Sequence, residues 1–149
     1  MKIRGLAVPF DAPTNIGGEF MEYFDRNAFN DLDDYGDIPL LIGHKKDTVP
    51  IARYRPGNPH STARVWVAAD GVRFEADITR RDVYEAIKRG DFTGVSIAFA
   101  QVDKERDSHW NLCSSPPVVC RLRAVIGEIS LVTFPAYKGA YVETMEGGV

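Results

Sequence analysis

Short runs of alternating hydrophobic and polar residues, separated by turn-forming residues, dominate the chain. The clearest runs span residues 2–8, 19–23, 64–68 and 72–78. Alternation with a period of two turns one side of a strand toward a core and the other toward solvent. An Ala-Asp-Gly sequence at 69–71 joins the last two runs and is typical of a hairpin turn. These runs predict strands in a mainly β protein.

Three further runs are apolar almost throughout, as expected for strands that are buried on both faces. They lie at residues 38–44, 94–100 and 121–134. Residues 49–54 form a shorter run, which we expect to pair with residues 38–44. These segments are predicted to supply the buried strands of the fold.

Two segments predict short helices. Residues 25–32 begin with Asp25, a residue type that favours the helix N-cap. Residues 82–89 carry an apolar stripe at helical spacing and are followed by Gly90, which suits the C′ position. Six to eight short strands with two small helices predict a closed or nearly closed β-barrel flanked by short helices.

Length and charge limit the class of protein. The 149 residues suit one domain over 1–149, and we expect residues 138–149 to form a flexible polar tail. The net charge of −3, from 18 Lys and Arg against 21 Asp and Glu, gives no basic excess that would indicate a nucleic-acid partner. No apolar run approaches the roughly 20 residues of a membrane-spanning helix, so no membrane partner is expected.

The chain has two cysteines, Cys113 and Cys120. Their spacing does not match a zinc site. The start of the chain lacks the long apolar stretch of a secretory signal, which favours two reduced thiols. A disulfide across a hairpin is the alternative.

Three polar residues interrupt the apolar runs and could act together. Ser96 lies in the run 94–100 and shares its strand face with two alanines, which leaves space around its hydroxyl. His44 ends the run 38–44, and Glu128 lies within the run 121–134. A serine, a histidine and a carboxylate from three separate strands are the parts of a hydrolytic triad.

Each of these residues has a proposed role and a structural alternative. His44 would take the proton of Ser96, and Glu128 would orient the imidazole and stabilise its charged form. Ser130 is an alternative third member, because it lies two residues after Glu128 and hence on the same strand face. In the structural interpretation, Ser96 is a core serine bonded to backbone, His44 lies at the surface and Glu128 is a solvated charge.

Six short segments carry a family resemblance over nearly the whole chain. They span residues 5–10, 24–29, 41–44, 70–74, 93–99 and 128–136. In their order and spacing the chain resembles the prohead (capsid maturation) serine proteases of tailed bacteriophages. The resemblance implies a fold similar to the barrel of assemblin, the maturational protease of herpesviruses.

The resemblance also implies roles for single residues. It assigns the nucleophile to Ser96 and the base to His44, and we place the third member on Glu128. In this family the histidine is commonly followed by Asp, whereas Lys45 follows it here, which favours Glu128 as the orienting acid. The oxyanion hole would be formed by backbone N–H groups around residues 136–137, Ala136 and Tyr137.

The expected function is that of a serine endopeptidase that cleaves capsid scaffolding protein, and itself, inside the phage procapsid in the host cytoplasm. No metal or organic cofactor is expected. The expected partners are the major capsid protein or its scaffolding segment and a second copy of the chain in a homodimer. The alternative is a non-catalytic capsid-assembly or scaffold-binding module with the same barrel. A metal-dependent hydrolase that uses His44, His60 and His109 is a third, weaker hypothesis, because their spacing matches no metal motif.

Overall fold

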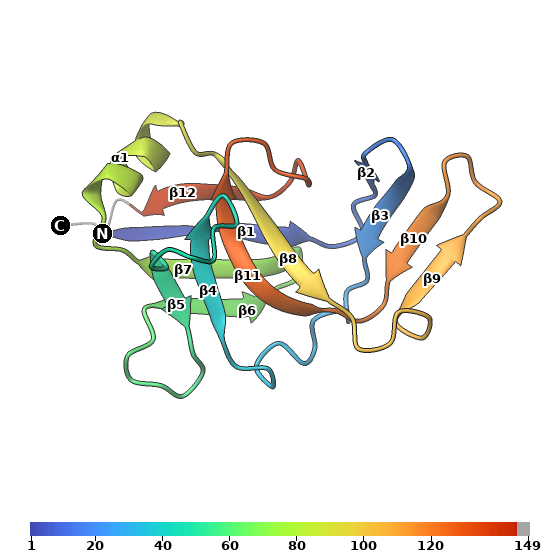
Figure 1. Cartoon of the computed structure of the whole chain (residues 1–149), viewed down its shortest axis with the longest axis horizontal. Helices are drawn as coiled ribbons and strands as arrows, with labels where there is room; N and C mark the ends of the chain where they lie inside the picture. Colours follow the sequence, from blue (N-terminus) through green and yellow to red (C-terminus); the bar gives the residue numbers. More distant parts are fainter. Residues whose placement is uncertain (146–149) are drawn as a thin grey trace.

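The computed structural model describes residues 1–145, which form three four-stranded β-sheets and one helix (Figure 1). Sheet A has the order β12-β1-β7-β6, from Tyr141–Met145, Lys2–Pro9, Gly71–Asp77 and Ala63–Val67. Sheet B has the order β2-β3-β10-β9, from Thr14–Ile16, Phe20–Phe24, Val118–Arg121 and Ser108–Asn111. Sheet C has the order β5-β4-β11-β8, from Ala52–Tyr54, Ile38–Ile42, Val125–Val132 and Gly94–Ala100.

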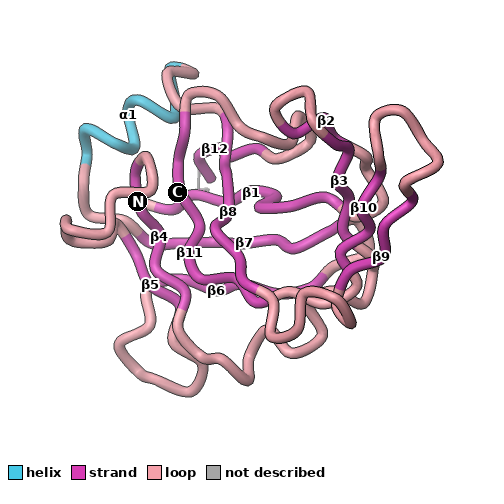
Figure 2. Tube along the Cα trace, turned by 45° about the vertical axis from the view of Figure 1, so that its right-hand side comes forward, coloured by secondary structure: helices cyan, strands magenta, loops and turns pink. Residues whose placement is uncertain are grey.

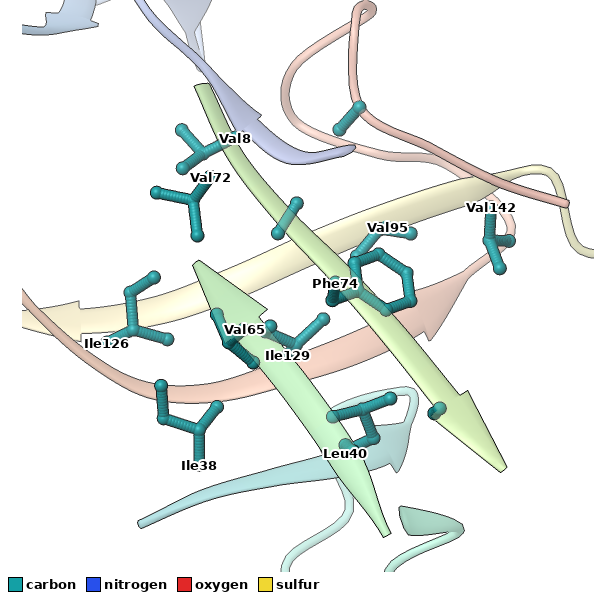
Figure 3. Packing of buried hydrophobic residues seen from close by; sticks show 14 of the residues in the cluster. Val8, Ile38, Leu40, Val65, Val72, Phe74, Val95, Ile126, Ile129 and Val142 are labelled. Carbon is teal, nitrogen blue, oxygen red and sulfur yellow. The ribbon is translucent and has the colours of Figure 1, made fainter. Parts of the chain in front are cut away.

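Sheets A and C enclose the hydrophobic core. Phe74 and Val65 of sheet A and Leu40, Ile129 and Val95 of sheet C are buried in one cluster (Figure 3). Along β6 and β7 of sheet A, buried residues alternate with less buried ones, as a sheet with one face against a core requires. The apolar alternation that predicted these two strands therefore also marks the inner face of sheet A.

The predicted barrel is not closed. No sheet among the described residues joins its own edges, and sheets A and C meet at their rims through isolated backbone hydrogen bonds. One bond, of 2.9 Å, runs from the Thr62 N–H to the Arg53 carbonyl, and another, of 3.2 Å, runs from the Val142 N–H to the Thr93 carbonyl. A barrel requires a continuous ladder with a consistent shear around the whole wall. The prediction of a mainly β fold was correct, but the closure was not.

Sheet B lies at the opposite end of the molecule from the helix (Figures 1 and 2). Phe24, at the end of β3, connects it to the core, because its buried ring contacts Phe29, Phe99 and Tyr137 at centroid distances of 5.0–5.7 Å. Sheet B therefore reaches both the Ser96 strand and the loop that follows β11.

One of the two helix predictions is confirmed. Helix α1, Arg81–Arg89, buries Val83 and Ile87 and ends at Gly90, which adopts the left-handed conformation with φ of 85°. Residues 25–32 instead form successive turns with hydrogen bonds between residues three apart. This segment is rich in Asn and Asp, whose side chains compete for backbone groups and favour turns over helix.

The end of the described chain also differs from the prediction. Residues 141–145 were expected in a flexible tail but form β12, which pairs with β1 at the edge of sheet A. Residues 146–149 lie outside the described residues. Within residues 1–145, Cys113 is exposed, Cys120 is buried, and both are free thiols. None of the described helices is long and apolar enough to span a membrane.

Candidate active site

A β-bulge in β11 determines where Glu128 points. Ile126 pairs with Phe99 of β8, but Glu128 pairs with Ala98, so Gly127 is the extra residue on β11. A bulge of this kind reverses the alternation of faces along a strand. Ile126 is therefore in the core, whereas Glu128 lies on the outer face of sheet C.

His44 lies in a tight turn after β4 and not at the end of a strand, as the sequence had suggested. Gly43 and His44 both have φ of 60°, and the Lys45 N–H donates to the Ile42 carbonyl at 3.2 Å. Two consecutive residues with positive φ, closed by such a bond, match a type I′ turn. A histidine in this conformation is uncommon and indicates a position fixed by its surroundings.

Three residues form a closed hydrogen-bond network on the outer face of sheet C. His44 Nδ1 is hydrogen-bonded to Glu128 Oε1, and the Ser130 hydroxyl donates to Glu128 Oε2 at 2.5 Å. Ser130 Oγ in turn accepts from the His44 backbone N–H at 3.0 Å. Since a carboxylate only accepts, Nδ1 is the imidazole nitrogen that donates, and Nε2 is left without a bond in the network. Glu128 therefore contacts the ring, while Ser130 contacts the backbone of the same histidine.

Ser96 lies on the strand beside this network. It is directly opposite Ser130 in the antiparallel pairing of β8 with β11, so both side chains project from the same face. The Ser96 residue is half-buried, and within residues 1–145 its hydroxyl makes no hydrogen bond. The structure thus brings His44, Glu128 and Ser130 into contact and places Ser96 next to them without a hydrogen bond to His44.

The loop after β11 crosses β8 just before Ser96. A Cβ added to Gly94 would lie 2.5 Å from Pro135 Cδ, so the Pro135 ring packs directly on the Gly94 backbone. Gly94 is two residues before Ser96 and on the same strand face. In the part of the chain that is described, the backbone N–H groups of Ala136 and Tyr137 donate to no acceptor. These two donors therefore have no internal acceptor among the described residues.

A pocket of about 360 Å³ opens beside Glu128. Pro39 and Leu41 of β4 line it, together with Lys46 and Pro50 from the loop that carries His44. The network therefore borders an accessible hollow on the β4 side of the sheet.

The sequence analysis overlooked a second buried carboxylate, Glu22 on β3. Its carboxylate accepts hydrogen bonds from the Tyr137 hydroxyl and, at 2.9 Å, from Arg121 Nε. The signal was present, because Glu22 stands in the largely apolar run 20–24, as Glu128 stands in its own strand.

The three histidines of the metal-dependent alternative do not come together. Among residues 1–145, no group of three His, Cys, Asp or Glu side chains could hold a metal ion. His60 lies in a turn between β5 and β6, and His109 lies in β9 of sheet B. The structure therefore gives the metal-dependent hypothesis no support.

Comparisons with known proteins indicate the family and the fold. A family model for the caudovirus prohead serine proteases matches residues 1–148. The fold is similar to that of KSHV protease, a herpesvirus enzyme, in a crystal structure with a hexapeptide phosphonate inhibitor. The TM-score is 0.54 and the sequence identity 15%, over 95% of this chain and 63% of that chain. No curated protein matches the sequence.

Proposed function

The chain belongs to the caudovirus prohead serine protease family, and from this membership and the site geometry we propose that it is a serine endopeptidase. Membership implies interaction with capsid proteins and a place inside the procapsid in the host cell. The proposed substrate is the capsid scaffolding protein or the scaffolding segment of the major capsid protein, and the enzyme also cleaves itself. A second copy of the chain is a further proposed partner, in a homodimer.

The hydrogen bond between His44 Nδ1 and Glu128 is the observation that carries this proposal. It fixes the tautomer in which Nε2 is free to accept a proton, which a general base for a serine requires. Ser96 is the hydroxyl across the strand pair, opposite Ser130. We assign Ser96 as nucleophile, His44 as base and Glu128 as the orienting acid, with Ser130 supporting both Glu128 and the His44 backbone.

The proposed reaction proceeds through an acyl-enzyme. Ser96 Oγ attacks the peptide carbonyl while its proton passes to His44 Nε2, and the carbonyl electron pair moves to oxygen. The oxyanion re-forms the carbonyl, the C–N bond breaks, and His44 gives the proton to the leaving amine. Water, deprotonated by His44, then hydrolyses the ester and regenerates Ser96. Glu128 stabilises the imidazolium in both halves of the reaction.

The backbone N–H groups of Ala136 and Tyr137 are the proposed oxyanion donors. The contact of Pro135 with Gly94 and the lack of an internal acceptor for either N–H group support this assignment. Preorganised donors of this kind stabilise the developing charge without reorganisation, and each contributes about 3 kcal/mol in enzymes where one was removed.

A fluorophosphonate probe tests the proposal. We expect it to label wild-type protein and not Ser96→Ala, in which alanine fits on the face shared with Ala98. Ser96→Ala should also leave scaffold protein uncleaved and retain the wild-type circular dichroism spectrum. Ser114→Ala, in the β9–β10 loop, is the matched control and should label normally. Labelling of Ser96→Ala at the wild-type rate would exclude Ser96 as the nucleophile.

The non-catalytic scaffold-binding module is the second candidate. The lack of a hydrogen bond between Ser96 and His44 within the described residues favours it. Proteases at rest also show long contacts between nucleophile and base, which tighten when substrate binds. A wild-type protein that binds scaffold protein but neither cleaves it nor reacts with the probe would establish the module and exclude the protease.

A further inference from the structure

A second hydrogen-bonded cluster surrounds Glu22, away from the His44 network. Glu22 and Tyr137 are both buried, and the Tyr137 hydroxyl donates to Glu22 Oε1. The other oxygen, Oε2, accepts from Arg121 Nε at 2.9 Å. A buried carboxylate is costly without partners, and here both oxygens have one.

Arg121 is also held by groups on β8, on β9 and in the loop between them. Its Nη1 donates to Gln101 Oε1 at 3.2 Å and to Ser108 Oγ at 3.0 Å. Its guanidinium also lies 5.7 Å from the centroid of the Phe99 ring and 5.9 Å from that of Trp110. The acceptor for the Tyr137 hydroxyl is therefore fixed to sheet B and to the end of β8, and is not a mobile surface charge.

Tyr137 links the Glu22 cluster to the loop after β11. This loop is held at two points. Pro135 packs on Gly94, and the Tyr137 side chain bonds Glu22 and packs on Phe24 with 5.7 Å between the ring centroids. Ala136 is exposed and lies between the two attachments. The peptide groups proposed as oxyanion donors therefore depend on both attachments.

We propose that Glu22 is a positioning residue for the protease reaction, which holds the Ala136 and Tyr137 N–H groups in place beside Ser96 through the Tyr137 hydroxyl. This inference rests on the proposed function. It assigns the buried cluster of sheet B a role in transition-state stabilisation, and the residues concerned need not touch the substrate.

Tyr137 meets the chemical requirement of this role. Burial, and the neighbouring Glu22 carboxylate, raise the pKa of the Tyr137 hydroxyl well above its ordinary value. The hydroxyl therefore stays protonated and continues to donate throughout the pH range in which a histidine base works.

The first test is Tyr137→Phe in the full chain, with Tyr54→Phe as control. Tyr54 also donates its hydroxyl to a carboxylate, Asp33 at 2.8 Å, but lies on β5 away from the loop. We expect Tyr137→Phe to lower the maximal labelling rate by a fluorophosphonate about 10- to 100-fold, because small displacements of donors cost rates of this order. The probe concentration at half-maximal rate should change less than about threefold, since binding is not the step affected. Tyr54→Phe should match wild type.

The second test is a double-mutant cycle with Glu22→Gln. If Glu22 acts through Tyr137, the Gln variant should slow labelling in the wild-type background and have no further effect in Tyr137→Phe. If the effects of Glu22→Gln and Tyr137→Phe on the labelling rate were additive in free energy, Glu22 would not act through Tyr137, and the proposal would be wrong.

Hydrogen exchange separates failure of this inference from failure of the proposed function. Tyr137→Phe should speed amide exchange at Ala140, whose N–H donates to the Tyr137 carbonyl at 3.1 Å, relative to wild type and to Tyr54→Phe, whether or not the protein is a protease. Unchanged exchange, or an unchanged maximal labelling rate, overturns the inference while the assignment of Ser96 stands. Faster exchange in Tyr137→Phe, together with a wild-type protein that the probe never labels, would support the attachment and refute the proposed function, and with it the role of Glu22 in that reaction.

Discussion

The chain buries two glutamates in β-strands, and the two differ in the kind of positive group that faces them. Glu128 is 2% exposed and bonds the ring of His44, whose side chain is 42% exposed. Glu22 has a 7% exposed side chain and bonds Arg121, of which 16% is exposed. Each carboxylate also accepts from a buried hydroxyl, Ser130 in one case and Tyr137 in the other.

The difference lies in whether the charge that faces each carboxylate can change. An arginine guanidinium keeps its proton in proteins, so the charge opposite Glu22 is permanent. In the proposed mechanism His44 takes and returns the proton of Ser96, so the charge facing Glu128 changes during turnover. We therefore expect identical substitutions at the two glutamates to differ in their main effect, which is on turnover at Glu128 and on stability at Glu22.

The largest expected effect is on turnover in Glu128→Gln. The amide keeps the shape and still accepts from Ser130, but it no longer stabilises the His44 imidazolium. We expect kcat to fall about 10²- to 10⁴-fold, as for the acid of better-known triads. Steady-state cleavage of scaffold protein would measure the loss, with chemical denaturation to verify a nearly unchanged free energy of unfolding. Wild-type turnover in this variant would leave Glu128 as a structural charge.

The same substitution at the other site, Glu22→Gln, should lower the stability of the fold, in addition to slowing labelling through Tyr137. It leaves the largely covered Arg121 guanidinium, 16% exposed, without its counter-charge, and breaking a buried ion pair from one side costs about 3–5 kcal/mol. Urea denaturation measures this as a fall in the free energy of unfolding at unchanged m-value. A loss below about 1 kcal/mol would mean that the Glu22–Arg121 pair stabilises the fold no more than an ordinary surface ion pair does. The proposed difference between the two glutamates would then be wrong.

Ser130→Ala should have an intermediate effect on turnover. Its hydroxyl connects Glu128 to the His44 backbone, so its loss loosens the turn but leaves the carboxylate on the ring. We expect kcat to fall about tenfold, the cost of one weakened positioning contact, which is about 1.4 kcal/mol. If Ser130→Ala were more damaging than Glu128→Gln, the orienting role would belong to Ser130.

The sequence indicated the hairpin, the chemical residue types and eight of the described strands, because these depend on local pattern. It did not indicate β2, β9, β10 or β12. Val67 and Val72 do face each other across the predicted hairpin, and α1 ends at the expected Gly90. The order of six short segments predicted membership of the prohead protease family. The match of the family model to residues 1–148 confirms this prediction. Of the candidate residues, His44 and Glu128 are hydrogen-bonded, and Ser96 lies opposite Ser130 on the neighbouring strand. Their catalytic roles are proposals.

What the sequence did not predict depends on non-local geometry. Period-two alternation places Ile126 and Glu128 on one face, and only the bulge at Gly127 separates them. Nothing local shows that His44 leaves the strand with positive φ, or that Glu22 finds Arg121 99 residues away. Closure of a barrel is likewise decided by the edges of sheets, which strand patterns do not describe.

The smallest expected effect comes from a surface pair with the same chemistry as the Glu22 pair. Asp37 bonds the Arg53 guanidinium twice, at 2.7 and 2.8 Å, but both side chains are more than 40% exposed. Asp37→Asn should therefore cost less than about 1 kcal/mol near neutral pH, because solvent screens exposed pairs. Comparison with Glu22→Gln then isolates burial as the cause of the larger loss.

The pH dependence of this pair gives a further check on the same comparison. The hydrogen bond from Arg53 lowers the pKa of Asp37 below its ordinary value of 3.8. A lowered pKa in the folded state means that the unfolded state binds the proton first, so the stabilisation is complete above the ordinary value. As the pH falls through the folded-state pKa, the stabilisation is lost. The difference in unfolding free energy between wild type and Asp37→Asn should thus be constant from pH 6 to 8 and shrink toward zero in acid. A difference that grows on acidification would show that Asp37 is not held as a carboxylate by Arg53.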